Sequence, residues 1–211
     1  GSASGSAPTR VRYGVPQGTV LGPILFVLYA AGLLRLILEH GLSPHAYADD
    51  VQVYGFCQPD ASVLLQDRIS ACIADVAVWM RSNRLQLNAA KTEIIWFASA
   101  RRQHQLPTAP IVIGSDAVSP VSTVRDLGVH LDADLSMRTH ISKTVASCFA
   151  SLRQIRSIRR SVPRPVLQSL VAALVISKLD YGSATLAGLP TVQLNRLQTV
   201  LNAAARLIFT A

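Results

Sequence analysis

The amino-acid sequence predicts an α+β fold that passes into an all-helical region. Half of the 211 residues are hydrophobic and only 15% are charged, a composition that suits a chain with a buried core rather than a disordered one. As far as about residue 137, short alternating apolar runs and turn residues occur between helical patterns. Beyond that point only helical periodicity remains, interrupted by Pro163 and Pro165.

Three regions follow from these patterns. Residues 1–10 begin with GSASGSAP, which is small and polar and is expected to be a flexible tail. Residues 11–137 form the predicted α+β region, and residues 138–211 form the predicted helical region.

An apolar run of fifteen residues, from Val20 to Leu34, follows a loop rich in Gly and Pro. A bilayer span needs about 20 residues, so a buried helix is the favoured interpretation and a signal peptide the alternative. Spacings of three and four predict that one face of this helix packs inward. That face consists of Leu25, Leu28, Gly32 and Leu36.

A β-hairpin and a long helix are predicted after this run. Residues 45–56 indicate two strands joined by a two-residue turn at Asp49-Asp50. The helix is expected to begin at Asp60, which suits an N-cap, and to end near residue 82. Its apolar face consists of Leu65, Ile69, Cys72, Val76, Trp79 and Met80.

Short strands and three further helices are predicted beyond residue 83. The strand candidates are residues 84–88, 92–98, 111–113, 118–121 and 127–131, and with the first hairpin they predict a sheet backed by helices on one face. Helices are expected at residues 141–160, 166–179 and 192–209. The apolar stripe of the first of these consists of Ile141, Val145, Cys148, Phe149, Leu152, Ile155 and Ile158.

Positive charge is concentrated in the second half of the chain. The net charge is +8, and residues 101–211 account for all of it, with thirteen basic and five acidic residues. Between Arg138 and Arg164 there are seven basic residues and no acid. This distribution favours a polyanionic partner, nucleic acid before a membrane surface, although a solvated helix face explains the charge equally well.

The three cysteines, Cys57, Cys72 and Cys148, cannot all pair with one another and share no metal-ligand spacing. They indicate a reduced protein with structural thiols. We therefore expect an intracellular location, nuclear or cytoplasmic, with no secretion and no membrane partner.

Two adjacent carboxylates at a hairpin turn are the most distinctive local feature. Like charges repel, so the Asp49-Asp50 pair costs stability unless a cation lies beside it. Mg²⁺ prefers carboxylate oxygens and keeps coordination positions open for water and substrate phosphates. The simpler alternative is an ordinary turn pair, because Asp tolerates turn geometry.

The surrounding residues favour the metal-site interpretation. YADD at residues 47–50 is preceded by GVPQGTVLGPILF and followed by NRLQLNAAKTEIIWF. This ordered set resembles the reverse transcriptase of non-LTR, LINE-type retrotransposons, especially the jockey-like branch. VRDLGVHLDADLS at residues 124–136 and the segment 179–208 resemble the stretches that follow in that family. The resemblance covers about residues 11–209.

The resemblance implies both a fold and an activity. Residues 11–137 would be part of a polymerase palm, an antiparallel sheet with packed helices, and residues 138–211 would be a helical thumb. The implied reaction is RNA-directed DNA synthesis by two-metal nucleotidyl transfer. It would use Mg²⁺, or Mn²⁺ in its place, with an RNA template, a DNA primer and dNTPs.

The resemblance also implies roles around the turn. Asp49 would be the direct metal ligand and Asp50 the supporting one, while Tyr47 would lie near the primer end. Lys91 would donate a proton to pyrophosphate. From the residues alone, Tyr47 could equally be a core side chain and Lys91 a solvated amine.

Two further groups of residues are implied to contact substrate. Pro16, Gln17 and Gly18 would contact the templating base and the incoming nucleotide, although Gln17 could merely cap a helix end. A basic thumb helix would contact the phosphate backbone without reading bases. Its basic residues are Lys143, Arg153, Arg156, Arg159 and Arg160.

The family carries a third aspartate on a strand before the GVPQG motif, and the residues before position 11 do not resemble that strand. The chain is therefore expected to be part of the enzyme and inactive alone. One alternative is a non-catalytic nucleic-acid-binding module that uses the basic helix. Another is an inert remnant whose exposed apolar surface self-associates.

Overall fold

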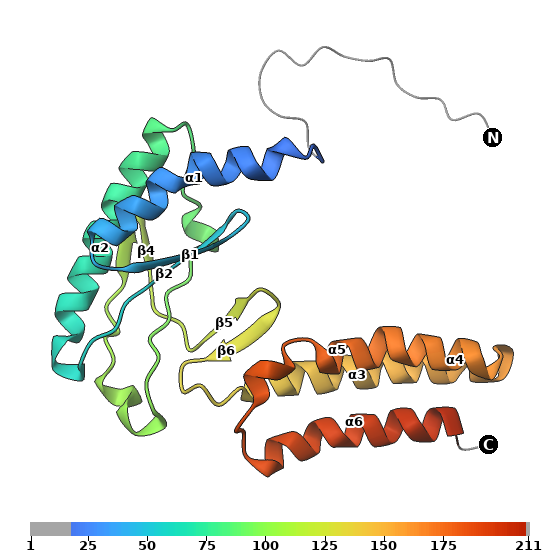
Figure 1. Cartoon of the computed structure of the whole chain (residues 1–211). Coiled ribbons are helices and arrows are strands. Elements are labelled where there is room, and N and C mark those ends of the chain that lie inside the picture. The colour runs from blue at the N-terminus through green and yellow to red at the C-terminus, as the bar shows by residue number, and fades with distance from the viewer. Residues whose placement is uncertain (1–17, 210–211) are drawn as a thin grey trace, which may run out of the picture. The chain divides into compact units, whose positions relative to one another are not determined.

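The computed structural model of the chain describes residues 18–209. These residues form two compact units, of which unit 1 comprises residues 18–92 with Pro110–Val118 and unit 2 comprises Glu93–Ala109 with residues 119–209. Each unit combines helices with antiparallel strand pairs (Figure 1). The predicted α+β fold class is confirmed. The described strands nevertheless form three separate two-stranded sheets rather than the single sheet that we expected.

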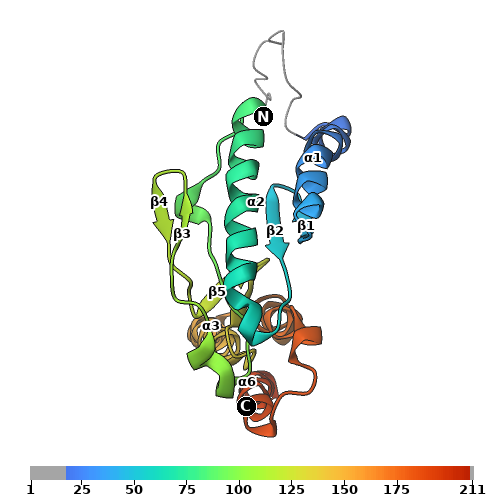
Figure 2. The same ribbon diagram turned by 90° about the vertical axis from the view of Figure 1, so that its left-hand side faces the viewer.

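Unit 1 consists of two long helices and two β-hairpins. Its elements are α1 (Leu21–Glu39), β1 (Ser43–Tyr47), β2 (Asp50–Tyr54), α2 (Ser62–Ser82), β3 (Ile111–Ile113) and β4 (Asp116–Val118), with short 3₁₀ helices at Pro59–Ala61 and Ala89–Lys91. Helix α2 lies between α1 on one side and β3 on the other (Figure 2). The core of the unit is therefore formed around α2.

Helix α2 packs through the face that its periodicity predicts. Leu65 and Cys72 are buried, and none of the other four predicted positions is exposed. The helix ends as expected, with the Asn83 side-chain amide donating to the carbonyl of Trp79 at 2.8 Å. Asp60 does not form the predicted cap, because a 3₁₀ turn precedes α2 and places Ala61 at the N-cap position.

Helix α1 is less buried than the sequence predicts, and on a different face. The buried residues are Ala30, Leu33 and Ile37, whereas Leu25 and Leu28 of the predicted stripe are exposed. The prediction was wrong because every face of this helix is apolar, and the positions of α2 and β1 decide which stripe is covered. Among the described residues α1 alone has the length and composition of a membrane span, a test that core helices and signal sequences also pass.

The predicted second hairpin, residues 84–98, is absent. Residues 89–91 form a 3₁₀ turn, and the strand-like segment that follows bonds to other parts of the chain. The backbone N–H of Val121 donates to the carbonyl of Ile94 at 2.8 Å, and that of Ala98 donates to the carbonyl of Ala133 at 3.1 Å. A strand requires a ladder partner, and residues 84–88 do not provide one here.

Unit 2 is mainly helical and contains one β-hairpin. Its elements are β5 (Thr123–Asp126), β6 (Val129–Asp132), α3 (Arg138–Ile158), α4 (Arg164–Val171), α5 (Ser177–Asp180) and α6 (Thr191–Phe209), with 3₁₀ helices at Ala100–Gln105, Arg159–Ser161 and Ser183–Leu186. The strand predicted at residues 127–131 is confirmed over residues 129–131, which lie in β6, but Leu127-Gly128 is the turn between β5 and β6. The helices predicted at residues 141–160 and 192–209 are confirmed.

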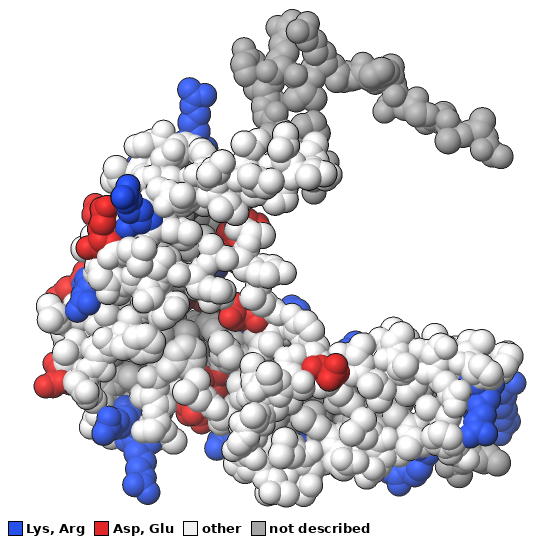
Figure 3. All heavy atoms as spheres, in the orientation of Figure 1, with Lys and Arg blue, Asp and Glu red and all other residues white. Residues whose placement is uncertain are grey.

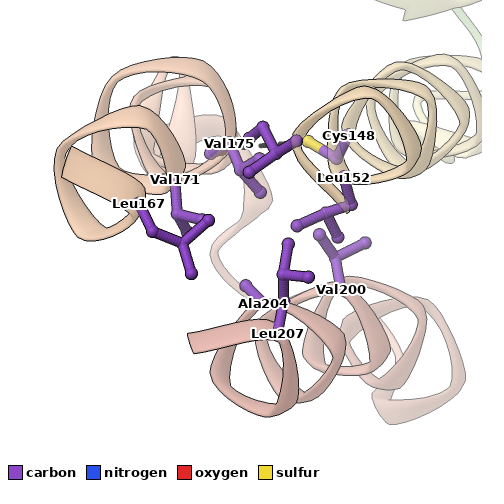
Figure 4. Close-up of a cluster of buried hydrophobic side chains, with 9 residues drawn as sticks. Cys148, Leu152, Leu167, Val171, Val175, Val200, Ala204 and Leu207 are labelled. Atoms are coloured by element: carbon purple, nitrogen blue, oxygen red, sulfur yellow. Dashed lines mark hydrogen bonds between the residues drawn. The ribbon is translucent and has the colours of Figure 1, made fainter. Parts of the chain in front are cut away.

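The core of unit 2 lies between α3, the α4–α5 segment and α6. Side chains from all three point toward one another (Figure 4). Cys148, Val175 and Val200, one from each element, have no exposed surface. The helix predicted at residues 166–179 is interrupted, because Ala172–Ile176 forms a π-helical turn between α4 and α5.

Asp132 holds the start of α3 against the end of β6. Its buried carboxylate accepts a hydrogen bond from the backbone N–H of Thr139 at 3.0 Å, which satisfies a donor in the first turn of α3. The hydroxyls of Thr123 and Ser136 donate to it as well, at 3.0 and 3.3 Å. Burial is the largest influence and raises the pKa of Asp132, but the hydrogen bonds together hold that pKa below the usual value of 3.8.

Acid is therefore expected to weaken this junction. Because the pKa of Asp132 is lower in the folded chain than in the unfolded chain, its stabilisation is complete above about pH 4 and is lost as the pH falls through the folded-state value. Asp132→Asn should lower the melting temperature at pH 6 and reduce its fall between pH 5 and pH 2.5, as measured by circular dichroism. Asp180→Asn, an exposed position in the same unit, is the control and should retain the wild-type pH profile.

Candidate metal and nucleic-acid site

The β1–β2 hairpin presents the two aspartates, and its register places them differently from the prediction. Tyr47 pairs with Asp50, so the two turn residues are Ala48 and Asp49, and Asp50 is the first residue of β2. The predicted turn was therefore displaced by one residue. Ala48 has φ +53°, a left-handed conformation that is uncommon for a residue with a Cβ. The tip of the hairpin is thus locally strained.

The base of the hairpin is anchored in unit 1. Leu42, just before β1, is 2% exposed, and Leu65 of α2 is 3% exposed. A Cβ on Gly55, just after β2, would lie 2.8 Å from a methyl of Leu65 and 2.9 Å from a methyl of Leu42, so a larger residue would displace these buried side chains. The buried base and the five-pair ladder position the tip, whose residues are all exposed.

Tyr47 shares a face of the hairpin with Asp50. Directly paired residues in an antiparallel ladder point to the same side, and this pair is the last one before the turn. Tyr47 is 62% exposed, so the alternative that it is a core residue is wrong. A phenol ring and a carboxylate therefore project together at the tip, with Asp49 beside them on the turn.

The two carboxylates have no protein partner among the described residues. Neither Asp49 nor Asp50 forms a side-chain hydrogen bond or an ion pair there. No group of three or more His, Cys, Asp or Glu side chains within residues 18–209 could hold a metal. Two exposed, adjacent carboxylates provide the hard oxygen donors that Mg²⁺ prefers, and they fit a metal as part of its ligand set.

The other predicted substrate contacts are only partly described. Pro16 and Gln17 lie outside residues 18–209. Gly18 has φ +86°, and a Cβ there would meet no atom within 4 Å, so backbone conformation rather than crowding requires the glycine. Lys91 is exposed at the end of its 3₁₀ turn, and no contact joins it to Asp49 or Asp50.

Four of the five predicted backbone-contact residues gather at one end of α3 instead of following its length. Arg153 and Arg156 lie in its last two turns, and Arg159 and Arg160 lie in the 3₁₀ turn that follows. We call these four residues the arginine patch, and Figure 3 shows basic side chains where α3 passes into α4. Of the predicted backbone contacts only Lys143 lies near the start of the helix.

A polar cluster that no sequence pattern indicated lies between α3 and α5. The ammonium of Lys178 donates to the hydroxyls of Ser147 and Ser151, each at 3.1 Å. The two serines are four residues apart and therefore lie on one face of α3. The sequence alone does not show that Lys178 of α5 meets this face.

A family model described as reverse transcriptase (RNA-dependent DNA polymerase) matches residues 3–131, more than half of the chain. The chain belongs to the reverse transcriptase family. The resemblance to non-LTR, jockey-like elements is confirmed by curated relatives of that kind. No solved structure matches the chain.

Three relatives are RNA-directed DNA polymerases of Drosophila elements. The probable polymerase from transposon BS of Drosophila melanogaster is 30% identical over 158 residues, which cover 72% of this chain and 17% of the relative. The probable polymerase from transposon X-element of the same species is 27% identical over 213 residues, covering 96% and 22%. The polymerase from mobile element jockey of Drosophila funebris is 30% identical over 139 residues, covering 63% and 14%. The chain thus spans less than a quarter of each relative.

The left-handed conformation of Ala48 predicts that glycine at this position stabilises the fold. The left-handed conformation costs a residue with a Cβ about 1–2 kcal/mol, and glycine avoids this cost. Glycine also loses more conformational entropy on folding, which offsets part of the gain. Ala48→Gly should therefore stabilise the fold by about 0.5–1 kcal/mol. Urea denaturation measures the change. Ala46→Gly, in the middle of β1, is the control and should destabilise the fold. If both variants destabilise equally, Ala48 is not left-handed.

Proposed function

We propose that the β1–β2 turn contributes to the catalytic metal site of an RNA-directed DNA polymerase. The observation that carries this proposal is the pair of exposed, unpartnered carboxylates, Asp49 and Asp50, at the strained tip of an anchored hairpin. The membership of the chain in the reverse transcriptase family supports it.

Enzymes of this family use divalent metal ions, and we assign Mg²⁺, or Mn²⁺ in its place, to this turn. Asp49 is the direct ligand and Asp50 the supporting one. When bound, two such ions activate the 3′-hydroxyl of the primer and stabilise the leaving pyrophosphate. We assign to Tyr47 a contact with the primer end, and its place on the same face as Asp50 supports this role.

Further ligands must complete this site. Mg²⁺ requires an octahedral set of oxygens, and two carboxylates on one turn provide only part of it. We assign a third carboxylate to a residue outside 18–209, since no described acid joins the pair. The isolated 211-residue chain should therefore extend a DNA primer on an RNA template weakly or not at all.

The remaining roles complete the proposal. Gly18 allows close approach of the incoming nucleotide and template base, with Pro16 and Gln17 beside it in the chain. Lys91 is the general acid that protonates pyrophosphate, and its exposed position leaves it accessible to substrate. Residues 11–137 act as part of the palm and residues 138–211 as the thumb.

Metal binding tests the carboxylate pair directly. The electron paramagnetic resonance signal of Mn²⁺ reports the free ion, so a titration gives its affinity for the chain. Asp49→Asn should reduce that affinity by about 10-fold or more, and Asp50→Asn should reduce it less. Asp67→Asn removes an equal charge from an exposed position on α2 and should have no effect. Equal affinity in all four proteins would disprove the metal site.

Primer extension tests the third ligand. With Mg²⁺, dNTPs and an RNA template, the 211-residue chain should give little product. Robust extension that Asp49→Asn abolishes would support the metal site and overturn the assignment of a third carboxylate outside residues 18–209.

A second candidate function is nucleic-acid binding without catalysis. It is favoured by the stretch from residue 135 to 179, which contains eight basic residues and no acid. Such a surface binds phosphates by charge, so its affinity falls steeply with salt. If binding of an RNA–DNA duplex survives Asp49→Asn while no extension occurs under any condition, this function replaces the first.

The arginine patch at the end of α3 makes a quantitative prediction. Each phosphate contact contributes about 0.9 to the slope of log affinity against log salt, so replacing Arg153, Arg156 and Arg160 by Gln should lower the slope by about 2–3. Fluorescence anisotropy with a labelled duplex measures it. The control replaces three exposed arginines of unit 1, which are Arg35, Arg81 and Arg84. An equal loss in both triple variants would point to net charge alone.

A further inference from the structure

Lys178 is held in a fixed position across the boundary between α5 and α3. Its ammonium donates to the hydroxyls of Ser147 and Ser151, both at 3.1 Å. Ser151 is only 9% exposed, whereas Ser147 and Lys178 are exposed. An ammonium at a protein surface is usually mobile on its long stem, so two simultaneous hydrogen bonds restrict it to one place.

No acidic side chain within residues 18–209 forms an ion pair with this ammonium. The chain has no Asp or Glu between Asp134 and Asp180, and Lys178 forms no ion pair with a described residue. Asp180 is two residues away and therefore about 200° around the helix from Lys178. An ammonium has three protons, and the two hydroxyls use two of them, which leaves one for a further acceptor.

The π-helical turn before α5 sets the direction of Lys178. Its i→i+5 hydrogen bonds rotate the residues that follow relative to an uninterrupted α-helix. The turn also packs tightly on α3, because Val175 is completely buried and its carbonyl lies 3.8 Å from the Cys148 thiol. The π-helical turn thus directs Lys178 toward the two serines. Such turns are frequent at functional sites.

We propose that Lys178 and Ser147 form a contact site for a nucleic-acid phosphate, distinct from the arginine patch at the end of α3. The Ser147 hydroxyl accepts from Lys178 and still has its own proton to donate, so the two side chains offer two donors to one anionic group. Ser151 fixes the ammonium from the buried side. Lys143, four residues before Ser147, continues the same face of α3.

This site deepens the proposed function and rests on its nucleic-acid partner. A phosphodiester is the acceptor that fits, because a single exposed ammonium binds phosphate as a point charge without reading bases. The contact adds affinity for any sequence and makes that affinity depend on salt.

Duplex binding by the 211-residue chain tests the site. Anisotropy of a labelled RNA–DNA duplex is measured across a salt series for the wild type, Lys178→Met and Arg101→Met. Lys178→Met should lower the salt slope by about 0.9 and weaken binding at low salt. Arg101→Met removes an equal charge from an exposed position in the 3₁₀ helix Ala100–Gln105, away from α3 and α5 in the sequence, and should change neither value by as much.

A second variant separates binding from folding. Ser147→Asp places a carboxylate beside the ammonium at an exposed position and keeps the lysine. It should weaken duplex binding at least as much as Lys178→Met does, with an unchanged or higher melting temperature. If Lys178 merely fastens α5 to α3, Lys178→Met lowers the melting temperature, and neither variant changes the salt slope; this result would overturn the site.

The same data distinguish this site from the proposed function. If the wild type binds and the arginine-patch variant weakens binding, but Lys178→Met and Ser147→Asp bind like the wild type, only the Lys178 site is wrong. If the wild type shows no salt-dependent binding at low salt, the nucleic-acid partner and this site are both wrong.

Discussion

The antiparallel ladder between β1 and β2 is the interaction on which the candidate metal site depends. Two adjacent carboxylates repel each other, and in a loop they would separate. Here the pairing of Tyr47 with Asp50 leaves only two residues for the turn, which fixes Asp49 on the turn and Asp50 at the start of β2 and forces Ala48 into a left-handed conformation. An isolated hairpin is marginally stable in water, so the ladder in turn relies on its buried base, where Leu42 and Leu65 of α2 both lie against Gly55.

Unit 2 folds although residues 135–179 contain eight basic residues and no acid, whose like charges repel one another. Its three-helix core brings apolar faces together and leaves the basic side chains at the surface. Asp132 stabilises α3 directly, through a hydrogen bond to the backbone N–H of Thr139 at the start of the helix. The cations farther along, including Lys178 and the arginine patch, remain available to a polyanion.

Sequence patterns predicted the buried face of helices that are apolar on one side only. They did not predict the buried face of a helix that is apolar all round, or the partners of short strands. The faces of α2 and α3 follow from apolar positions three and four residues apart, except that Ile158, the last residue of the predicted α3 stripe, is exposed. The family motifs indicated the reverse transcriptase membership. Helix α1 is apolar on every side, so periodicity could not select the stripe with Ala30, Leu33 and Ile37. The segments 84–88 and 92–98 resemble strands, but strand formation depends on a partner elsewhere in the chain.

The sequence by itself determined the helix-forming segments, the hairpin with its paired aspartates and the concentration of positive charge, because each depends on residues close together in the chain. Only the tertiary structure decided the exact turn, which places Asp50 on β2 beside Tyr47, and the meeting of Lys178 with Ser147 and Ser151. Register and helix rotation depend on the packing of distant segments. A shift of one residue in the strand register, or the matching rotation of a helix, changes which side chains meet. Local sequence patterns do not determine either quantity.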